Sequence, residues 1–287
     1  MKRLLLFVFV PAVVVGLVAA FAPTSDTSYS CGPLPPQLQH EYLALGDSLG
    51  YGYGATDPAT KGYVPLFRDY LVSKDWLHRP LLLKNLSVPG ATSTTLIYGQ
   101  LQPPQPPQLP AALAELRARN GNWWPFDDIN VVTVDIGGND LLATLQICTT
   151  QPLPVCFVAQ QAAFDTIAAN LDYTLDELRA AAGPFTKIIV MTYYNGFVAQ
   201  GRPDCNALAP LGELALEGNL ALGRPKGAND YIRDVADANG AKVAELVPGG
   251  DWPALLGPTN ILSDCVHAND SGYAIMADAF ADAYEAH

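Results

Sequence analysis

Five short apolar segments recur along the sequence, and longer segments with helical spacing separate them. Each apolar segment is rich in Leu, Ile and Val and is short enough to form a buried strand. The predicted strands are Tyr42–Leu45, Leu81–Leu86, Ile129–Ile136, Lys187–Thr192 and Ala241–Val247. Strands that alternate with helices favour a mostly parallel sheet with helices on both faces. The pattern therefore predicts an α/β fold.

Helical spacing and turn residues define the segments between these strands. The predicted helices are Tyr63–Lys74, a short helix ending near Leu101, Ala111–Arg119, Val158–Ala182, Leu211–Leu222, Asn229–Asn239 and Ser271–Glu285. The proline-rich segment Gln102–Pro110 indicates polyproline II character and is interpreted as a stiff connector. No second composition regime appears after residue 40, so residues 41–287 are expected to form a single domain preceded by a linker, 23–40.

The first 22 residues resemble a secretory signal. A short positive start, Met1–Arg3, precedes the apolar segment Leu4–Ala22. The alternative is an uncleaved membrane anchor, because 19 apolar residues approach a spanning length. Either interpretation places the domain outside the cytoplasm, and a secreted protein is favoured. The net charge of −12 and the lack of a dense basic run argue against a nucleic-acid partner.

The five cysteines are consistent with an oxidising compartment. Cys148 and Cys156 flank a proline-containing loop and would close a short, hairpin-like ring. Cys205 and Cys265 form a plausible second pair, which would pin the loop around residue 265, and Cys31 is left over. Spacing alone does not fix the pairing. Since the cysteines lack zinc-site spacing, no metal site is predicted.

A serine follows the first predicted strand within Gly46-Asp47-Ser48-Leu49-Gly50. The flanking glycines allow a sharp turn that presents the hydroxyl at the carboxyl end of the strand, where open α/β sheets bind ligands. Ser48 is therefore a candidate nucleophile. The alternative is an ordinary surface turn, because Gly, Asp and Ser are common turn residues.

A serine nucleophile needs a base within hydrogen-bonding reach. His267 follows the fifth strand and is expected at the same sheet edge as Ser48, whereas His40 and His78 are expected at the opposite edge and His287 is terminal. The base in turn needs a carboxylate that orients it. Asp264 is favoured for this role because it lies three residues before His267.

Two other acids, Asp251 and Asp270, also lie near His267 in the sequence and remain alternatives to Asp264. Asp47 is interpreted as an organiser of the serine loop, because neighbouring side chains such as those of Asp47 and Ser48 usually point apart.

The oxyanion of an acyl-transfer reaction requires preorganised hydrogen-bond donors. Candidates follow the first three strands: the backbone N–H of Ser48, the backbone N–H of Gly90 and the side-chain amide of Asn139. Glycine at position 90 permits close approach of the backbone. Together these residues place a nucleophile, a base and three donors at one edge of the predicted sheet.

Four blocks that carry these residues resemble the conserved blocks of the SGNH hydrolases, also called the GDSL esterase/lipase family. The blocks are Gly46-Asp47-Ser48-Leu49, Val88-Pro89-Gly90-Ala91, Gly137-Gly138-Asn139-Asp140 and Asp264-x-x-His267, in the order of the family. The resemblance implies a flavodoxin-like three-layer α/β/α sandwich with a five-stranded parallel sheet. It also implies that no metal or organic cofactor is used. Ala268 departs from the proline that many members have after the histidine.

The resulting hypothesis is a secreted serine hydrolase of carboxylic esters that forms an acyl-enzyme on Ser48. Its partner would be a small-molecule or lipid ester, and no obligate protein partner is inferred. Carbohydrate acetylesterase and lysophospholipase activities both remain open, and a non-catalytic carbohydrate- or lipid-binding module on the same fold is the alternative. Gly46-x-Ser48-x-Gly50 also fits the nucleophile elbow of α/β-hydrolases, but that fold places several strands before its serine.

The side chains expected near the serine give one indication of substrate. Tyr51, Tyr53, Leu141 and Leu142 suggest an apolar acyl site, but they could equally belong to the core.

Overall fold

The computed structural model describes residues 39–75, 81–121, 127–198, 203–247, 256 and 258–286. These residues belong to one unit, Leu34–His287. The expected signal segment 1–22, residues 23–38 of the expected linker and Cys31 lie outside the described residues, as do His78, Asp251 and His287. No helix within the described ranges is long and apolar enough to cross a membrane.

Five parallel strands form the main sheet, as the sequence predicts. In spatial order they are β2 (Leu82–Asn85), β1 (Glu41–Gly46), β5 (Ile129–Asp135), β6 (Lys187–Met191) and β7 (Lys242–Ala244). Every residue of β1 is buried, and so is every residue of β5 except Asn130. Burial on both faces explains why these central strands are continuous apolar runs in the sequence.

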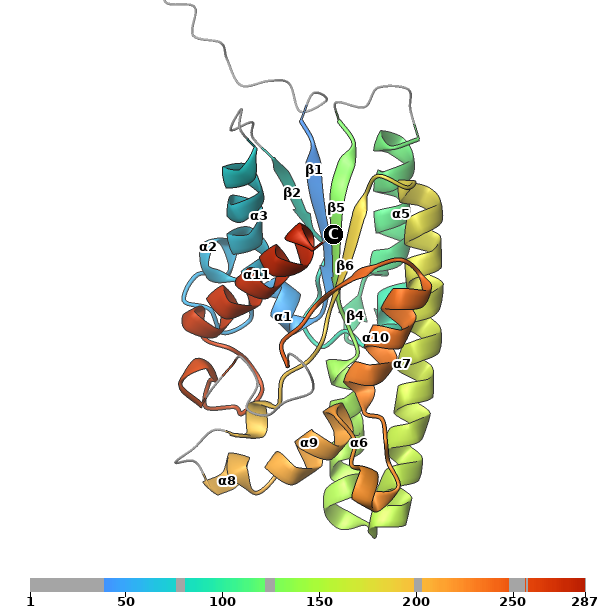
Figure 1. Cartoon of the computed structure of the whole chain (residues 1–287), viewed down its shortest axis with the longest axis vertical. Coiled ribbons are helices and arrows are strands. Elements are labelled where there is room, and N and C mark those ends of the chain that lie inside the picture. The colour runs from blue at the N-terminus through green and yellow to red at the C-terminus, as the bar shows by residue number, and fades with distance from the viewer. Residues whose placement is uncertain are drawn as a thin grey trace, which may run out of the picture. The chain divides into compact units, whose positions relative to one another are not determined.

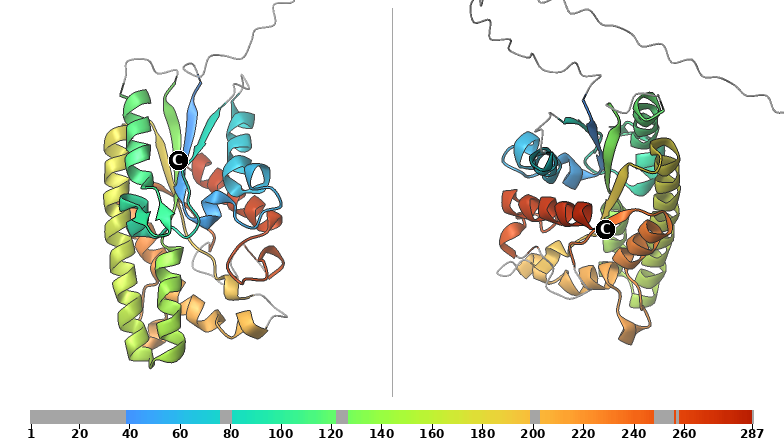
Figure 2. Two further views of the ribbon diagram at one scale, coloured as in Figure 1. Left: turned by 180° about the vertical axis from the view of Figure 1, so that it is seen from behind. Right: turned by 45° about the horizontal axis from the view of Figure 1, so that its top comes forward.

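Helices cover both faces of the sheet and complete an α/β/α sandwich (Figures 1 and 2). One face carries α3 (Tyr63–Lys74) and α11 (Asp270–Glu285), and the other carries α4 (Ser93–Tyr98), α5 (Gln108–Arg119), α7 (Leu153–Ala182) and α10 (Ala228–Ala238). Aromatic rings join α3 to its surroundings: Phe67 meets Tyr42 of β1 edge-on at 5.4 Å between ring centroids, and Tyr63 stacks on Phe280 of α11 at 4.7 Å.

The proline-rich segment differs from the prediction. Two short antiparallel strands, β3 (Gln100–Leu101) and β4 (Pro104–Gln105), replace a polyproline II connector, and α5 begins at Gln108. Proline is compatible with the first turn of a helix, where its missing N–H needs no partner, so Pro110 does not delay α5.

A helix that the sequence did not reveal, α6 (Gly138–Thr150), starts inside the asparagine block. The predicted disulfide between Cys148 and Cys156 is present and closes a short ring. This ring is a tight turn between α6 and α7, and α7 starts five residues before the predicted Val158. The predicted helix Leu211–Leu222 is also shorter: α9 (Ala209–Leu216) ends before Gly218, whose φ of 73° interrupts it, and a 3₁₀ turn follows at Leu220–Leu222.

Short elements and loops gather beyond the carboxyl ends of the strands. They include α1 (Ser48–Tyr51), α2 (Pro58–Lys61), α8 (Pro203–Asn206) and 3₁₀ turns at Gly196–Val198 and Pro258–Asn260. In Figure 1, α6, α8 and α9 lie below the sheet at this edge. The loops that carry the candidate functional residues therefore leave the sheet at one end.

Candidate active site

Ser48 lies at a sharp turn between β1 and α1. Asp47 caps α1 by accepting the N–H of Leu49 at 2.9 Å, which agrees with its predicted role as a loop organiser. A Cβ atom on Gly46 would lie 2.0 Å from Oδ1 of Asp135, and one on Gly50 would lie 2.3 Å from Oγ of Ser87. Glycine is required on both sides because the turn packs directly against neighbouring side chains.

Ser48, His267 and Asp264 form one hydrogen-bonded chain. The Oγ atom of Ser48 lies 2.8 Å from Nε2 of His267, and Nδ1 of His267 lies 2.6 Å from Oδ2 of Asp264. The other carboxylate oxygen of Asp264 accepts the N–H groups of Val266 and His267 at 3.0 and 2.9 Å. Partial burial raises the pKa of Asp264, but the hydrogen bonds from His267 and Val266 outweigh it and hold the pKa below its usual value.

The other candidates from the sequence lie elsewhere. The His40 ring contacts the backbone oxygen of Asp128 at 3.3 Å, just before β5 begins and thus at the opposite sheet edge. Asp270 accepts the N–H and hydroxyl of Thr56 at 2.8 and 2.6 Å. The structure therefore brings together Ser48, His267 and Asp264, and does not include His40 or Asp270 in that chain.

The loop that carries Asp264 and His267 is held by several distinct contacts. An antiparallel bridge joins Ile261 to Ala268, and the hydroxyl of Tyr194 donates to the backbone oxygen of Val266 at 2.5 Å. The predicted disulfide between Cys205 and Cys265 is present and ties this loop to α8. A Cβ atom on Gly196 would lie 2.3 Å from the Cys265 carbonyl oxygen, so the loop packs tightly against the Gly196 backbone.

Two of the three predicted oxyanion donors border one cavity. Ser48 and Asn139 line it, and Asn139 donates one amide hydrogen to the backbone oxygen of Ala91 at 2.9 Å. Gly90 precedes Ala91 in an exposed turn with a φ of 80° and is not a lining residue. Among the described residues, the N–H groups of Ser48 and Gly90 have no hydrogen-bond acceptor. The hydrogen bond from Asn139 links α6 to the turn that contains Gly90 and Ala91.

A buried pair of carboxyl groups, Asp47 and Asp135, supports the serine turn, and Asp135 was not among the residues predicted from the sequence. Asp135 accepts the N–H of Gly50 at 3.0 Å and the hydroxyl of Tyr63 at 2.5 Å, while Asp47 accepts the hydroxyl of Tyr193 at 2.9 Å. Burial raises the pKa of both carboxyl groups, and the charge of Asp47 raises that of Asp135 further. The signal for Asp135 in the sequence is a carboxylate at the end of a mostly apolar strand.

Gln108 is a second residue without a sequence signal. Its side-chain amide accepts the N–H of Gly46 and donates to the Gly46 carbonyl, both at 2.8 Å. These two bonds pair the last residue of β1 with the first turn of α5, and so fix where the serine turn begins.

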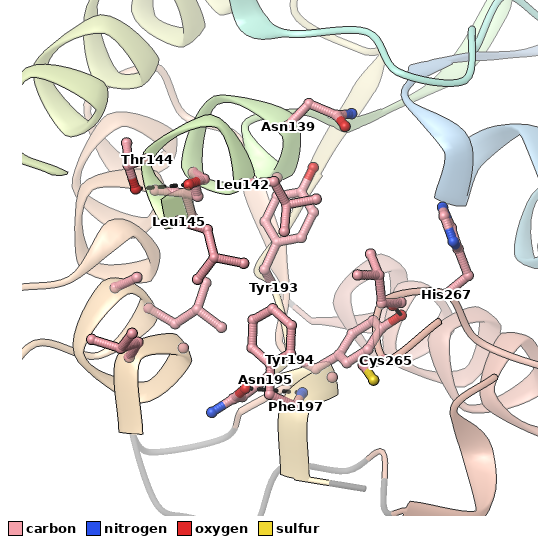
Figure 3. Close-up of a pocket in the computed structure, with 18 of the residues that line it drawn as sticks. Asn139, Leu142, Thr144, Leu145, Tyr193, Tyr194, Asn195, Phe197, Cys265 and His267 are labelled. Atoms are coloured by element: carbon pink, nitrogen blue, oxygen red, sulfur yellow. Dashed lines mark hydrogen bonds between the residues drawn. The ribbon is translucent and has the colours of Figure 1, made fainter. Parts of the chain in front are cut away.

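A cavity of about 210 Å³ extends from Ser48 and His267 between α6 and α9. Figure 3 shows His267 on one side of it and Thr144 and Leu145 on the opposite side. Leu141 and Leu142 line the cavity, whereas Tyr51 and Tyr53 do not. Tyr53 is about half exposed and instead packs its ring on His267, with centroids 4.5 Å apart.

Within the described part of the chain, no group of three or more His, Cys, Asp or Glu side chains is placed to hold a metal ion.

The family model of the GDSL-like lipase/acylhydrolase family matches residues 44–275. No curated protein sequence matches this chain. Among solved structures, the lipase Lip_vut3 from a goat rumen metagenome is similar over 85% of this chain and 97% of its own, with 20% identity and a TM-score of 0.57.

Two further structures share the fold. A catalytic variant of the acetylxylan esterase Axe2 from Geobacillus stearothermophilus has 14% identity and a TM-score of 0.52, over 86% of this chain and 95% of its own. An extracellular lipase from Streptomyces rimosus has 18% identity and a TM-score of 0.50, over 85% and 99%. The family match and the shared sandwich agree with the resemblance in the sequence blocks. The chain belongs to the GDSL-like lipase/acylhydrolase family and is a carboxylic ester hydrolase.

Proposed function

We propose that Ser48, His267 and Asp264 are the catalytic triad of a secreted serine esterase. The observation that carries this proposal is the continuous chain of two short contacts, 2.8 Å from Ser48 Oγ to His267 Nε2 and 2.6 Å from His267 Nδ1 to Asp264 Oδ2. Such a chain lets a neutral imidazole receive the serine proton while the carboxylate fixes the ring tautomer.

The reaction follows from these contacts. As Ser48 Oγ attacks the ester carbonyl, its proton passes to Nε2 of His267, and Asp264 stabilises the imidazolium that forms. His267 then returns the proton to the leaving alcohol, which leaves an acyl group on Ser48. A water molecule attacks this acyl group as His267 takes one of its protons. His267 then returns that proton to Ser48 Oγ as the bond to the acyl carbon breaks, which releases the acid product and free Ser48.

The substitution Ser48→Ala tests the nucleophile. Because the hydroxyl forms the covalent bond, we expect the turnover of p-nitrophenyl butyrate to fall by at least about 10⁴-fold, with an unchanged melting temperature. A folded variant that keeps wild-type turnover would reject Ser48 as the nucleophile. If the wild-type protein also hydrolyses no ester, the alternative of a non-catalytic binding module on the same fold is favoured.

The oxyanion of each tetrahedral intermediate would be held by the N–H of Ser48, the N–H of Gly90 and the remaining amide hydrogen of Asn139. The unused N–H groups and the fixed Asn139 side chain support this assignment. We expect Asn139→Ala to lower kcat by about 10²–10³-fold, since that is the usual cost of losing one oxyanion donor. A kcat within twofold of wild type would remove Asn139 from the oxyanion hole.

Secretion is supported by the apolar segment Leu4–Ala22 and by two disulfides among the described residues. It can be tested by expressing the full chain with its own N-terminus in a secreting host and determining the mass of the product in the medium. We expect a protein that starts near residue 23. Full-length protein confined to the membrane fraction would favour the uncleaved anchor.

A further inference from the structure

The ring of Tyr53 contacts the imidazole of His267, in addition to the two hydrogen bonds that the imidazole makes within the triad. The ring centroids are 4.5 Å apart and the ring planes are tilted by 47°. This separation is at the short end of the range for aromatic pairs, so the two rings are in direct contact. Tyr53 does not line the cavity next to Ser48, and its ring therefore meets His267 from outside that cavity.

The backbone of Tyr53 is held from two sides. Its N–H donates to the Ser48 carbonyl at 2.8 Å, and its carbonyl accepts the hydroxyl of Tyr273 in α11 at 2.6 Å. The next residue, Gly54, packs closely on the loop of the candidate base, because a Cβ atom there would lie 2.2 Å from Leu262 Cδ1. These contacts do not involve the Tyr53 side chain, so they fix its starting point whichever residue stands at this position.

The orientation of His267 otherwise depends on a partly exposed contact. Asp264 contacts Nδ1 of the imidazole and Ser48 contacts Nε2. The Asp264 side chain is 41% exposed, so water can compete for its hydrogen bond to the imidazole. A large ring packed against the imidazole limits the space into which it can rotate, and so favours the orientation that keeps Nε2 at Ser48.

The proposed reaction also places a positive charge on His267. An aromatic ring attracts a cation held over its face within about 6 Å of the ring centroid, and the attraction is stronger where water is largely excluded. The His267 side chain is only 19% exposed, so its imidazolium would be mostly shielded from water. The Tyr53 ring can therefore stabilise the imidazolium more than the neutral imidazole, and a preference of this kind lowers the barrier.

We propose that Tyr53 is a positioning residue for ester hydrolysis: its ring holds the imidazole of His267 at Ser48 and stabilises the imidazolium. This assignment rests on the proposed function of the triad, because Tyr53 acts through the base. Since Tyr53 contacts His267 and lies outside the cavity, it should affect the rates of the chemical steps more than the binding of the ester.

Substitutions of Tyr53 separate its ring from its bulk and its hydroxyl. We expect Tyr53→Leu, which keeps apolar bulk, to lower kcat for p-nitrophenyl butyrate about tenfold, with KM within threefold of wild type. Tyr53→Phe keeps the ring and should have a kcat within threefold of wild type. A Leu variant with wild-type kcat, or a Phe variant as slow as the Leu variant, would overturn the proposal.

Tyr173 provides the matched control. It is 47% exposed, against 49% for Tyr53, and it lies on α7, which covers the opposite face of the sheet from α11. Tyr173→Leu should leave kcat and KM as in wild type. A kcat as low as that of Tyr53→Leu would make the loss a general effect of removing a half-exposed tyrosine, and the proposal would fail. A cooperative thermal transition shows that each variant is folded, and Tyr53→Met replaces the Leu variant if that one is not.

A carbamate ester shows whether Tyr53 acts on the base or on the leaving alcohol. The base acts both when the enzyme is acylated and when it is deacylated, but the alcohol has left before deacylation begins. With p-nitrophenyl dimethylcarbamate, release of p-nitrophenol measures the first step, and the return of esterase activity after removal of the reagent measures the second. We expect Tyr53→Leu to slow both steps about tenfold. A loss confined to the first step would mean that Tyr53 contacts the alcohol, and would overturn its proposed role.

The variant His267→Ala separates failure of this proposal from failure of the proposed function. If His267→Ala keeps wild-type turnover, the triad itself is wrong. If His267→Ala is inactive while Tyr53→Leu keeps the wild-type kcat, the triad stands and the role of Tyr53 is overturned.

Discussion

The two halves of the candidate triad are held in different ways. The turn that presents Ser48 is part of the core: Asp47 is 2% exposed, and the N–H groups of Gly50 and Gly46 donate buried hydrogen bonds to Asp135 and Gln108, which fix the turn at both ends. The loop that presents His267 lies at the surface, where the Asp264 side chain is 41% exposed. This loop depends on a strand bridge, one tyrosine and the Cys205–Cys265 disulfide. The candidate nucleophile is therefore positioned by packing, and the candidate base by a few local restraints.

The largest effect should come from breaking the contact between the two halves. We expect His267→Ala to lower kcat for p-nitrophenyl butyrate by about 10⁴–10⁶-fold, and adding Ser48→Ala to cause little further loss, because residues that act as a unit have non-additive effects. Steady-state kinetics of the two single variants and the double variant measure this. Additive losses would mean that His267 and Ser48 act independently.

The second test removes the crosslink from the surface half. Replacing both Cys205 and Cys265 by Ser opens a link between residues 60 apart, which the chain-entropy model values at about 4 kcal/mol of unfolding free energy. We also expect kcat to fall about tenfold at temperatures where the variant is folded, because the loop loses a restraint next to Asp264.

The matched variant replaces Cys148 and Cys156 by Ser. Because these residues are only 8 positions apart, the same model predicts a loss of about 2.5 kcal/mol of unfolding free energy. Denaturant unfolding and kcat of the folded proteins compare the two. If the Cys148 and Cys156 variant loses more of its kcat than the Cys205 and Cys265 variant, the disulfide is not what positions the base.

The smallest effect is expected in the core half and depends on pH. Burial raises the pKa of Asp135 above that of the unfolded chain, so the folded protein retains a proton that the unfolded chain releases. The protonated Asp135 therefore stabilises the folded protein at pH values below the usual carboxyl pKa. This stabilisation is lost as the pH rises toward the folded-state pKa, and each unit of difference between the two pKa values corresponds to about 1.4 kcal/mol of unfolding free energy. Asp135→Asn should therefore reduce the loss of stability between about pH 5 and about pH 8.

Asp47 is buried beside Asp135 and its pKa is also raised, so the variant should retain part of the pH dependence. Melting temperatures across this range are the readout. Identical pH profiles for wild type and Asp135→Asn would show that Asp135 titrates alike in the folded and unfolded chains.

The secondary-structure elements differ in how well the sequence predicts them. The central strands were predictable because burial on both faces makes them continuous apolar runs, as in Ile129–Ile136. Helix α6 was not, because Gly137-Gly138 signals a turn and its first residues belong to the asparagine block. The alternation of apolar strand segments with helical segments is a local pattern, and it was enough to predict a mostly parallel sheet.

The residues at the candidate site also differ in how well the sequence predicts them. Ser48, Asn139, Asp264 and His267 stand in short blocks with recognisable spacing, so they could be nominated as candidates. Asp135 and Gln108 act through contacts with residues far away in the sequence, such as the contact between Gly46 and Gln108, which lie 62 positions apart. No local pattern encodes such a contact, and only the packed structure reveals it.

Covalent labelling reports on Ser48 and His267 in a single experiment. Wild-type protein, Ser48→Ala and His267→Ala would be treated with diisopropyl fluorophosphate and their peptides analysed by mass spectrometry. We expect one adduct on Ser48 in the wild type, no adduct in Ser48→Ala, and a rate of labelling in His267→Ala that is lower by at least about 10³-fold. Labelling of another residue in the wild type, or equally rapid labelling of Ser48 without His267, would contradict it.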